Sequence, residues 1–298
     1  MRIFVTGATG YIGSAITSAL VHAGHSVVAM ARPSARTHAL REMGVELVEG
    51  SLSTIDDRAG VMRETDAVIH AASDSSAERT RLDRNAIETA LENARGVFVY
   101  TSGVWVLGNT GESEADETTA PNPLALVAWR PEHEAKVLES SSDRLRTAVV
   151  RPGCVYGGRQ SLLAQWFSAA EKGDPLEIVG AGTNRWSMVH LDDVADCYLK
   201  IVEGGMRGVF HAVDDSRSTI VEMARAVAET AGRGSAVQMI PLEEARKTRG
   251  SLADALAIDQ QVASNRTRAR LSWQPACRTF LSTIERQCEE WKQTRNDA

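Results

Sequence analysis

The stretch MRIFVTGATGYIG, residues 1–13, decides the fold prediction. Its residues Arg2–Val5 are mostly apolar and predict a short buried strand. Glycines recur after that strand, and the residues Ser14–Ala23 then repeat apolar side chains at helical spacing. A strand, a glycine turn and a helix in this order predict the first βαβ unit of a parallel α/β sheet.

Gly7, Gly10 and Gly13 have the spacing GxxGxxG. Gly7 permits a tight turn, Gly10 lets the backbone approach a pyrophosphate, and Gly13 lets the helix pack closely on the sheet. The helix start then offers N–H groups and the positive end of its dipole, and Thr9 adds a hydroxyl. A glycine turn without a ligand is the alternative, but its place between strand and helix favours dinucleotide binding.

Strands and helices continue to alternate for about 150 residues, which predicts a doubly wound parallel sheet of the Rossmann type. We expect a dinucleotide-binding domain over residues 1–160, to which residues 186–210 return. Residues 161–298 are expected to form mainly a smaller C-terminal α/β substrate domain. The further strands are predicted at Ser26–Ala31, Val45–Glu49, Ala67–His70, Val97–Thr101, Ala148–Arg151, Leu176–Val179, Val209–Val213 and Val237–Ile240. The later helices are predicted at Leu162–Ala170, Leu191–Val202, Ile220–Ala231 and Phe280–Lys292, and a loop at Gly108–Pro123.

Composition excludes several classes of protein. The 298 residues are 43% hydrophobic and 24% charged, with a net charge of −6, and no basic stripe indicates nucleic acid as a partner. No window approaches the roughly 20 apolar residues of a membrane helix. The four cysteines are far apart in the sequence and form no CxxC pair, which indicates reduced packing residues in a cytoplasmic protein.

The end of the second strand decides between NAD and NADP. NAD binding usually places an acidic residue there for the ribose 2′-hydroxyl, but Arg32 stands at this position, and Arg36 follows. A guanidinium matches a 2′-phosphate in charge and geometry, so NADP is favoured over NAD. A solvated arginine in a loop is the alternative interpretation.

Five segments carry a family resemblance. They are TGATGYIG (6–13), AVIHAAS (67–73), VYTSGVWVLG (99–108), VVRPGCVYGG (149–158) and RWSMVHLDDVADCY (185–198). In this order they resemble the extended and atypical short-chain dehydrogenases/reductases, in the nucleoside-diphosphate-sugar epimerase-like branch. The resemblance covers nearly the whole chain, and it implies an NAD(P)-dependent oxidoreductase or epimerase-like enzyme with a small-molecule substrate. The oligomeric state stays open, although a homodimer is usual for such folds.

The resemblance also implies which residues contact the cofactor. EGSLS (49–53) resembles the segment that contacts the adenine, although Ser51 stands where an Asp is usual. Residues after the fourth strand would line the pyrophosphate and ribose, and a segment near residue 151 would approach the nicotinamide. The implied cofactor contacts are Gly7, Thr9, Gly10, Tyr11, Ile12, Gly13, Arg32, Ser51, Leu52, Ala71, Ala72, Arg151 and Val155.

The catalytic pattern of the family is broken. Its members use a Ser or Thr together with Tyr-x-x-x-Lys, but no tyrosine here is followed four residues later by lysine. Trp129 and His133 have the corresponding spacing, and Ser102 resembles the catalytic serine, with a register that is uncertain by one residue. Trp129 is no proton donor, whereas His133 could titrate near neutrality. A packing Trp129 with a solvated or capping His133 is the alternative.

Further candidates follow from the resemblance. Arg185 would contact a substrate diphosphate, and Tyr156 would bound the substrate cleft. His190 and the acidic residues Asp192 and Asp193 are expected to fix domain packing and cap the next helix. A metal site formed by these three residues is the alternative, but no HxxxH motif or Cys/His set supports it. A rival hypothesis is an NADP-binding regulator or sensor without turnover, since the dyad is missing.

Overall fold

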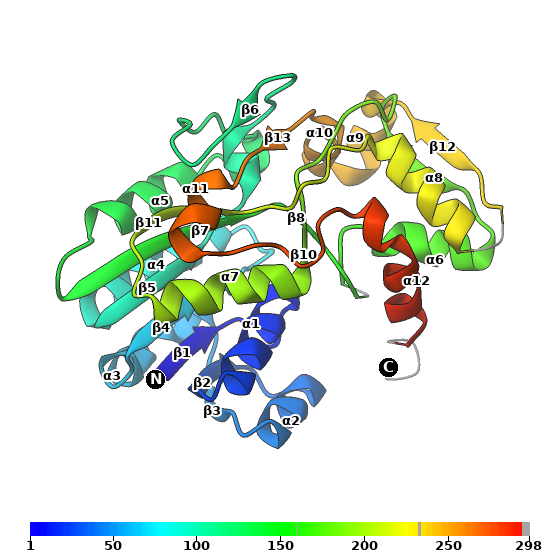
Figure 1. Cartoon of the computed structure of the whole chain (residues 1–298). Coiled ribbons are helices and arrows are strands. Elements are labelled where there is room, and N and C mark those ends of the chain that lie inside the picture. The colour runs from blue at the N-terminus through cyan, green and yellow to red at the C-terminus, as the bar shows by residue number, and fades with distance from the viewer. Residues whose placement is uncertain (159, 232–233, 294–298) are drawn as a thin grey trace.

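The computed structural model describes residues 1–158, 160–231 and 234–293, and its centre is one parallel sheet (Figure 1). Seven strands lie in the order β11-β7-β5-β4-β1-β2-β3, and every pairing is parallel. The predicted α/β Rossmann architecture is therefore confirmed. The strands are β1 (Arg2–Thr6), β2 (Ser26–Ala31), β3 (Glu46–Glu49), β4 (Ala67–His70), β5 (Gly96–Thr101), β7 (Leu145–Pro152) and β11 (Gly208–Ala212).

Helices cover both faces of this sheet, as the alternation along β1 requires. Ile3 and Val5 pack in one cluster with residues of α1 (Tyr11–His22) and α7 (Leu191–Glu203). Phe4 packs in the opposite cluster with residues of α4 (Arg79–Asn93) and α5 (Arg130–Glu139). The shorter elements beside them are α2 (Ala35–Glu42), η1 (Leu52–Arg58), α3 (Ala59–Arg63) and α11 (Asn265–Leu271).

A second, smaller core lies beyond the sheet, built around Trp166, Trp186 and Phe280. Its helices are α6 (Ala164–Lys172), α8 (Ile220–Thr230), α9 (Leu242–Arg249), α10 (Leu252–Ala257) and α12 (Ile284–Gln293). Three parallel two-stranded pairs belong to this half or link it to the sheet. They are β8 (Cys154–Tyr156) with β10 (Met188–His190), β9 (Leu176–Val179) with β12 (Val237–Ile240), and β6 (Glu114–Ala115) with β13 (Gln261–Val262). Short 3₁₀ turns occupy η2 (Val104–Leu107), η3 (Ala125–Val127) and η4 (Leu281–Thr283).

The predicted elements agree with the structure in type, but the prediction for the last third of the chain is incomplete. The predicted loop Gly108–Pro123 contains the short strand β6, and the predicted helix Phe280–Lys292 divides into η4 and α12. The helix α11 and Trp273 pack in the core of the large sheet, so the last third of the chain does not lie in the second core alone. The domain boundary near residue 160 stays a prediction.

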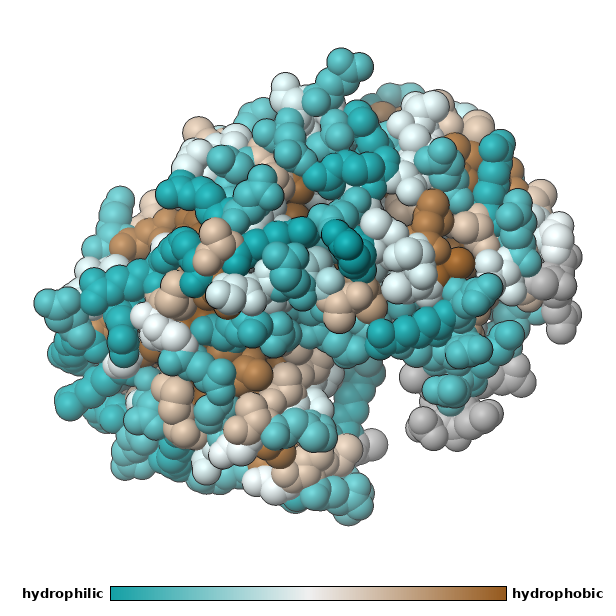
Figure 2. Space-filling model, in the orientation of Figure 1, coloured by the Kyte–Doolittle hydropathy of each residue, from teal (hydrophilic) through white to brown (hydrophobic). Residues whose placement is uncertain are grey.

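The surface and the cysteines complete the description. The face drawn in Figure 2 is largely hydrophilic, with apolar side chains in small separate groups. Cys154, Cys197, Cys277 and Cys288 are unpaired and buried, as expected of packing residues. None of the helices in the described part of the chain is both long and apolar enough to cross a membrane.

Candidate active site

The glycine loop is held by contacts that only glycine permits. Gly7 has φ +78°, and a Cβ there would lie 2.6 Å from the backbone nitrogen of Ala72. A Cβ on Gly13 would lie 2.1 Å from the carbonyl oxygen of Gly7, so α1 packs directly on the turn. Gly10 precedes α1 and brings no side chain to its first N–H groups, and the first turn holds no acidic residue. These residues fit the pyrophosphate of a dinucleotide.

Two arginines lie beside this loop. Arg32 directly follows β2, and its side chain is exposed. Arg36 is the second residue of α2, and its Nη1 donates to the carbonyl oxygen of Thr9 at 3.1 Å. Ser51 and Leu52 start η1 at the neighbouring strand end, with Ser51 Oγ 2.8 Å from Ser53 Oγ and Leu52 buried. Arg32 and Arg36 therefore bring two cationic side chains to the end of β2.

A pocket of about 320 Å³ opens at the carboxyl ends of the central strands. In open α/β sheets this edge is where ligands bind. Its walls come from the start of α1, the β5–η2 turn, the start of α5 and the β7–β8 turn. The lining residues are Tyr11, Ile12, Ser102, Gly103, Val104, Trp105, Val127, Arg130, Pro152, Gly153, Cys154, Val155, Gln160 and Leu162.

Two hydroxyl side chains end β5, and the structure separates their roles. Thr101 Oγ1 accepts a hydrogen bond from Tyr198 OH at 2.7 Å, so this hydroxyl is engaged in the core. Ser102 lines the pocket and is only 8% exposed, yet its Oγ has no hydrogen-bond partner. A buried hydroxyl without a partner is costly, and a ligand in the pocket would satisfy it.

Arg130, the first residue of α5, was not predicted from the sequence and also lines the pocket. Its Nη1 donates to the carbonyl oxygen of Thr101 at 2.7 Å, and its guanidinium carbon lies 4.7 Å from the centre of the Trp129 ring. The sequence signal was weak because it consisted only of a cation next to the position of the missing tyrosine.

His133 is buried in a polar network rather than solvated. Its Nδ1 lies 2.7 Å from Asp83 Oδ2, which also accepts from Tyr100 OH at 2.9 Å. The other carboxylate oxygen lies 3.2 Å from His70 Nε2, and His70 Nδ1 lies 2.7 Å from Thr6 Oγ1. The network thus connects the strand before the glycine loop with the helix that carries His133.

The charge of Asp83 fixes the direction of these hydrogen bonds. Burial opposes its ionisation, but hydrogen bonds from His133 and His70 hold the pKa of Asp83 well below its usual range. An ionised carboxylate only accepts, so His133 Nδ1 and His70 Nε2 each carry a proton. The other ring nitrogen of His133, Nε2, is buried and has no hydrogen-bond partner.

The solvated or capping alternative for His133 is therefore wrong. Trp129 packs against the ring of His133 with a centroid distance of 4.9 Å, and its Nε1 is buried without a partner. Neither Trp129 nor His133 lines the pocket. Their direct part in catalysis stays a prediction.

Several predicted contact residues already have partners. Arg151 is buried in an ion pair with Glu134, at 2.5 Å between Nη2 and Oε2, and its side chain also approaches His211. Tyr11 OH donates to the carbonyl oxygen of Gly157 at 2.5 Å, and burial raises the pKa of Tyr11. Ala71 and Ala72 contact the glycine turn through their backbone. Among the predicted cofactor contacts, the described pocket lining contains Tyr11, Ile12 and Val155.

The two predicted substrate residues also point elsewhere. Tyr156 is buried, and its hydroxyl donates to Asp214 Oδ2 at 3.1 Å. Arg185 forms a two-pronged ion pair with Asp259, with Nε–Oδ1 at 2.9 Å and Nη2–Oδ2 at 2.6 Å. Neither side chain lines the pocket, so the structure does not bring them to Ser102. Their roles toward a substrate stay predictions.

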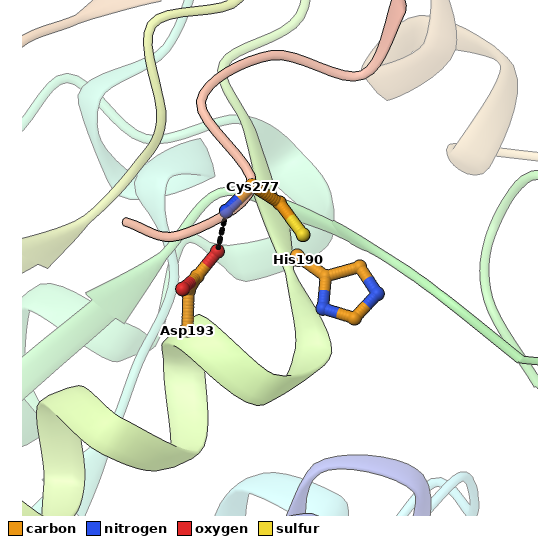
Figure 3. Close-up of side chains that lie close together, drawn as sticks. All are labelled: His190, Asp193 and Cys277. Atoms are coloured by element: carbon orange, nitrogen blue, oxygen red, sulfur yellow. Dashed lines mark hydrogen bonds between the residues drawn. The ribbon is translucent and has the colours of Figure 1, made fainter. Parts of the chain in front are cut away.

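His190, Asp193 and Cys277 lie close together, with one potential ligand atom from each within 4.8 Å of the others (Figure 3). Hydrogen bonds account for this cluster. His190 Nδ1 accepts from the N–H of Asp192 at the start of α7, and the Asp193 carboxylate accepts from the N–H groups of Ala276 and Cys277. Burial raises the pKa of the Cys277 thiol to about 11, which disfavours a thiolate ligand. The predicted capping and packing role is confirmed.

Sequence comparison agrees with this geometry. The family model described as the NAD dependent epimerase/dehydratase family matches residues 3–210. An uncharacterized protein of Schizosaccharomyces pombe is 31% identical, over 95% of this chain and 98% of its own length. A 3-diazoavenalumate denitrifying reductase of a Streptomyces species is 27% identical, over 92% of this chain and 96% of its own length.

Solved structures show the same fold. A UDP-glucose 4-epimerase of Thermotoga maritima, solved with UDP-glucose, has a TM-score of 0.84 at 19% identity and covers 99% of this chain and 100% of its own. A human epimerase family protein, solved with NADPH, has a TM-score of 0.82 at 20% identity and covers 97% of this chain and 99% of its own. The fold and the glycine cradle define a Rossmann-type protein of the short-chain dehydrogenase/reductase kind. More narrowly, this chain belongs to the NAD dependent epimerase/dehydratase family.

Proposed function

We propose that this chain is an NADP-dependent oxidoreductase that transfers hydride between the nicotinamide and a carbonyl or carbinol carbon of a small molecule. The observation that carries the proposal is the buried, unpartnered Ser102 hydroxyl, which lines a pocket between the glycine cradle and α5. Several relatives are named as reductases, which supports reduction over epimerisation. A nicotinamide cofactor supplies the hydride in such chemistry, and the protein binds and positions the reactants.

The glycine loop, Gly7–Gly13, and its neighbouring arginines would hold the cofactor. Gly7, Gly10 and Gly13 let the backbone approach the pyrophosphate, which the N-terminus of α1 would bind. Arg32 is exposed at the end of β2, and Arg36 lies over Thr9. Both cations would suit a 2′-phosphate, and this match supports our proposal of NADP rather than NAD.

Ser102 would donate a hydrogen bond to the substrate oxygen, and the neighbouring Arg130 charge would stabilise that oxygen as it becomes negative. His133 would accept a hydrogen bond at Nε2, because Asp83 holds the ring proton on Nδ1. In this proposal His133 would orient a hydroxyl of a bound molecule or accept a proton from it, although it is not among the described residues that line the pocket. The proton that completes carbonyl reduction would reach the substrate oxygen from water.

Turnover tests this proposal. NADPH oxidation is followed by its absorbance, with a panel of small aldehydes, ketones and 2-oxo acids as substrates. Ser102→Ala is expected to lower kcat/KM by about a hundredfold, as loss of one oxyanion donor does. His133→Ala is also expected to lower it, by at least about tenfold. Ser140→Ala, at the exposed end of α5, is the matched control and should keep full activity. Unchanged turnover in His133→Ala would remove His133 from the mechanism.

Cofactor preference is tested separately by calorimetry. NADPH should bind more tightly than NADH, and Arg32→Met should reduce that preference about tenfold because a charge-assisted contact to phosphate is lost. Arg81→Met, an exposed arginine on α4, is the control. Equal affinity for both nucleotides in the unaltered chain would contradict the NADP assignment.

The second candidate function is an NADP-binding regulator or sensor without turnover. One observation favours it. Among the described lining residues, the pocket offers no carboxylate, lysine or histidine, and its one tyrosine donates to Gly157. Tight NADPH binding without oxidation by any member of the panel would favour this alternative.

A further inference from the structure

Arg130 is the one charged side chain among the described residues that line the pocket. Its guanidinium is fixed from two sides, by the Thr101 carbonyl oxygen at 2.7 Å and by the Trp129 ring at 4.7 Å from the guanidinium carbon. In the described part of the chain, no carboxylate lies within ion-pair distance of it. Arg151 and Arg185 differ, because each forms a two-pronged bond with a carboxylate.

A half-buried guanidinium that has no carboxylate within ion-pair distance among the described residues is ready to bind an anion. The guanidinium has five N–H donors in a planar fork, and the Thr101 carbonyl uses only one side of it. Taking a charge out of water is costly unless an opposite charge approaches it. A carboxylate matches the geometry of this fork with two parallel hydrogen bonds.

The walls around Arg130 define the rest of the ligand. They are mainly apolar, and include Val104, Trp105, Val127 and Leu162. The volume of about 320 Å³ lies at the lower end of the range of roughly 300–1,000 Å³ for small-molecule pockets. Such walls fit a ring or a branched hydrocarbon, whereas a sugar would leave its hydroxyl groups without partners.

Ser102 is the second, independent sign of a ligand here. Its buried hydroxyl lines the same pocket and has no partner. Arg130 bonds the carbonyl oxygen of Thr101, the residue directly before Ser102, so the cation and the hydroxyl meet at one end of β5. Together they form a polar end to an otherwise apolar pocket.

We propose that this pocket binds a small, apolar carboxylate through the guanidinium of Arg130, and that the substrate carries this carboxylate beside the carbonyl whose oxygen accepts from Ser102. The inference rests on the proposed function in one respect, namely that the bound carboxylate is part of the substrate. A nucleotide sugar fits less well, because its diphosphate needs cations and Arg185 is already bound to Asp259. Arg130 is thus the specificity-determining residue.

Benzoate and its neutral counterpart benzamide test the inference. Each is titrated by calorimetry into the full chain, alone and with saturating NADP⁺, with UDP-glucose as a third ligand. Benzoate is expected to bind at least about tenfold more tightly than benzamide, since a bidentate ion pair is lost with the amide. Arg130→Met should abolish this difference, and Arg130→Lys should keep part of it. Arg81→Met is the matched control.

The outcomes separate the two proposals. Three results would each overturn the carboxylate site. The first is equal affinity for benzoate and benzamide, and the second is benzoate binding by Arg130→Met that is as tight as in the unaltered chain. The third is tighter binding of UDP-glucose than of benzoate. The comparison of benzoate with benzamide on the unaltered chain holds even if Arg130→Met does not fold. Failure to bind NADPH, with benzoate bound through Arg130, would instead contradict the proposed function and leave the carboxylate site standing.

Discussion

The glycine loop and the start of α5 lie at the same edge of one sheet, yet they follow the family pattern to different degrees. In the loop, each glycine of the pattern is present, and two of them lie where a Cβ would meet backbone within 2.6 Å. At the start of α5, tryptophan and histidine replace the Tyr and Lys of the dyad, and the histidine is turned into the core. The site that binds through backbone N–H groups therefore follows the family pattern, whereas the site that acts through side chains departs from it.

The difference has a physical reason. A pyrophosphate is bound by backbone N–H groups, so the loop tolerates no added side chain whatever the substrate is. The groups at α5 act through side chains, and these can be exchanged when the substrate changes. Arg130 and Ser102 then form a different polar end for the pocket, while His133 lies behind it in the network around Asp83. Substitutions in the glycine loop and substitutions at the start of α5 should therefore affect different properties of the protein.

The largest effect is expected in the loop. Gly13→Ala would place a Cβ 2.1 Å from the carbonyl oxygen of Gly7, so β1 and α1 must separate. Overpacking of this kind should cost about 3 kcal/mol of unfolding free energy, and NADPH binding should fall below detection. Urea unfolding and calorimetry measure the two effects.

The matched control is Gly60→Ala in α3, where the nearest atom to the added Cβ lies at 3.9 Å. Alanine is the better helix former, so stability should stay level or rise by up to about 1 kcal/mol. If Gly13→Ala binds NADPH normally, the glycine loop tolerates an added side chain, and the contrast between this loop and the start of α5 is wrong.

The second prediction concerns the network beneath α5. Asp83→Ala would leave donors of His70, Tyr100 and His133 buried without an acceptor. The unfolding free energy at pH 7 should fall by about 3 kcal/mol, while Asp143→Ala, a fully exposed position, should change little.

The pH dependence gives this prediction its sign. The pKa of Asp83 is depressed in the folded chain, so its contribution is present above the unfolded pKa of about 4 and is lost as pH falls below it. The difference between Asp83→Ala and the unaltered chain should therefore narrow from pH 4 toward pH 3. A difference that stays constant over this range would mean that the carboxylate charge is not what the network depends on.

Much of the fold could be predicted because it depends on backbone patterns. The strands Ser26–Ala31, Ala67–His70, Leu176–Val179 and Val237–Ile240 were predicted with their observed bounds. Apolar runs and glycine stops carry that information locally. The strands β6 and β13 were not predicted, because two residues each give no periodicity and their pairing joins positions far apart in the sequence.

The site was harder to predict because side-chain partners come from distant elements. Arg185 was expected to bind a substrate diphosphate, but Asp259, more than seventy residues away, bonds its guanidinium. The sequence around Arg185 gives no sign of Asp259, and the sequence around Asp259 gives no sign of Arg185. Arg130 shows the converse, since its importance follows from the lack of a carboxylate beside it, which only the folded chain shows.

The smallest predicted effect concerns Tyr156, the other expected substrate residue that the fold turns inward. Its hydroxyl donates to Asp214, and burial raises the pKa of Asp214 to about 6 although the N–H and hydroxyl of Ser216 lower it. Because this carboxyl holds its proton more tightly in the folded chain, stability should fall as pH rises from about 4 to about 6. The loss is about 2 kcal/mol.

Asp214→Asn cannot ionise, so its unfolding free energy should lack this fall, while Asp143→Asn should keep it. Urea unfolding at half-unit steps between pH 4 and pH 7 measures the slope. If Tyr156 and Asp214 belong to the buried core, Asp214→Asn should also leave NADPH and benzoate binding unchanged. If Asp214→Asn also loses benzoate binding, Tyr156 and Asp214 act at the pocket and not only in the core. The side-chain part of the site, which we contrast with the glycine loop, would then include residues outside α5.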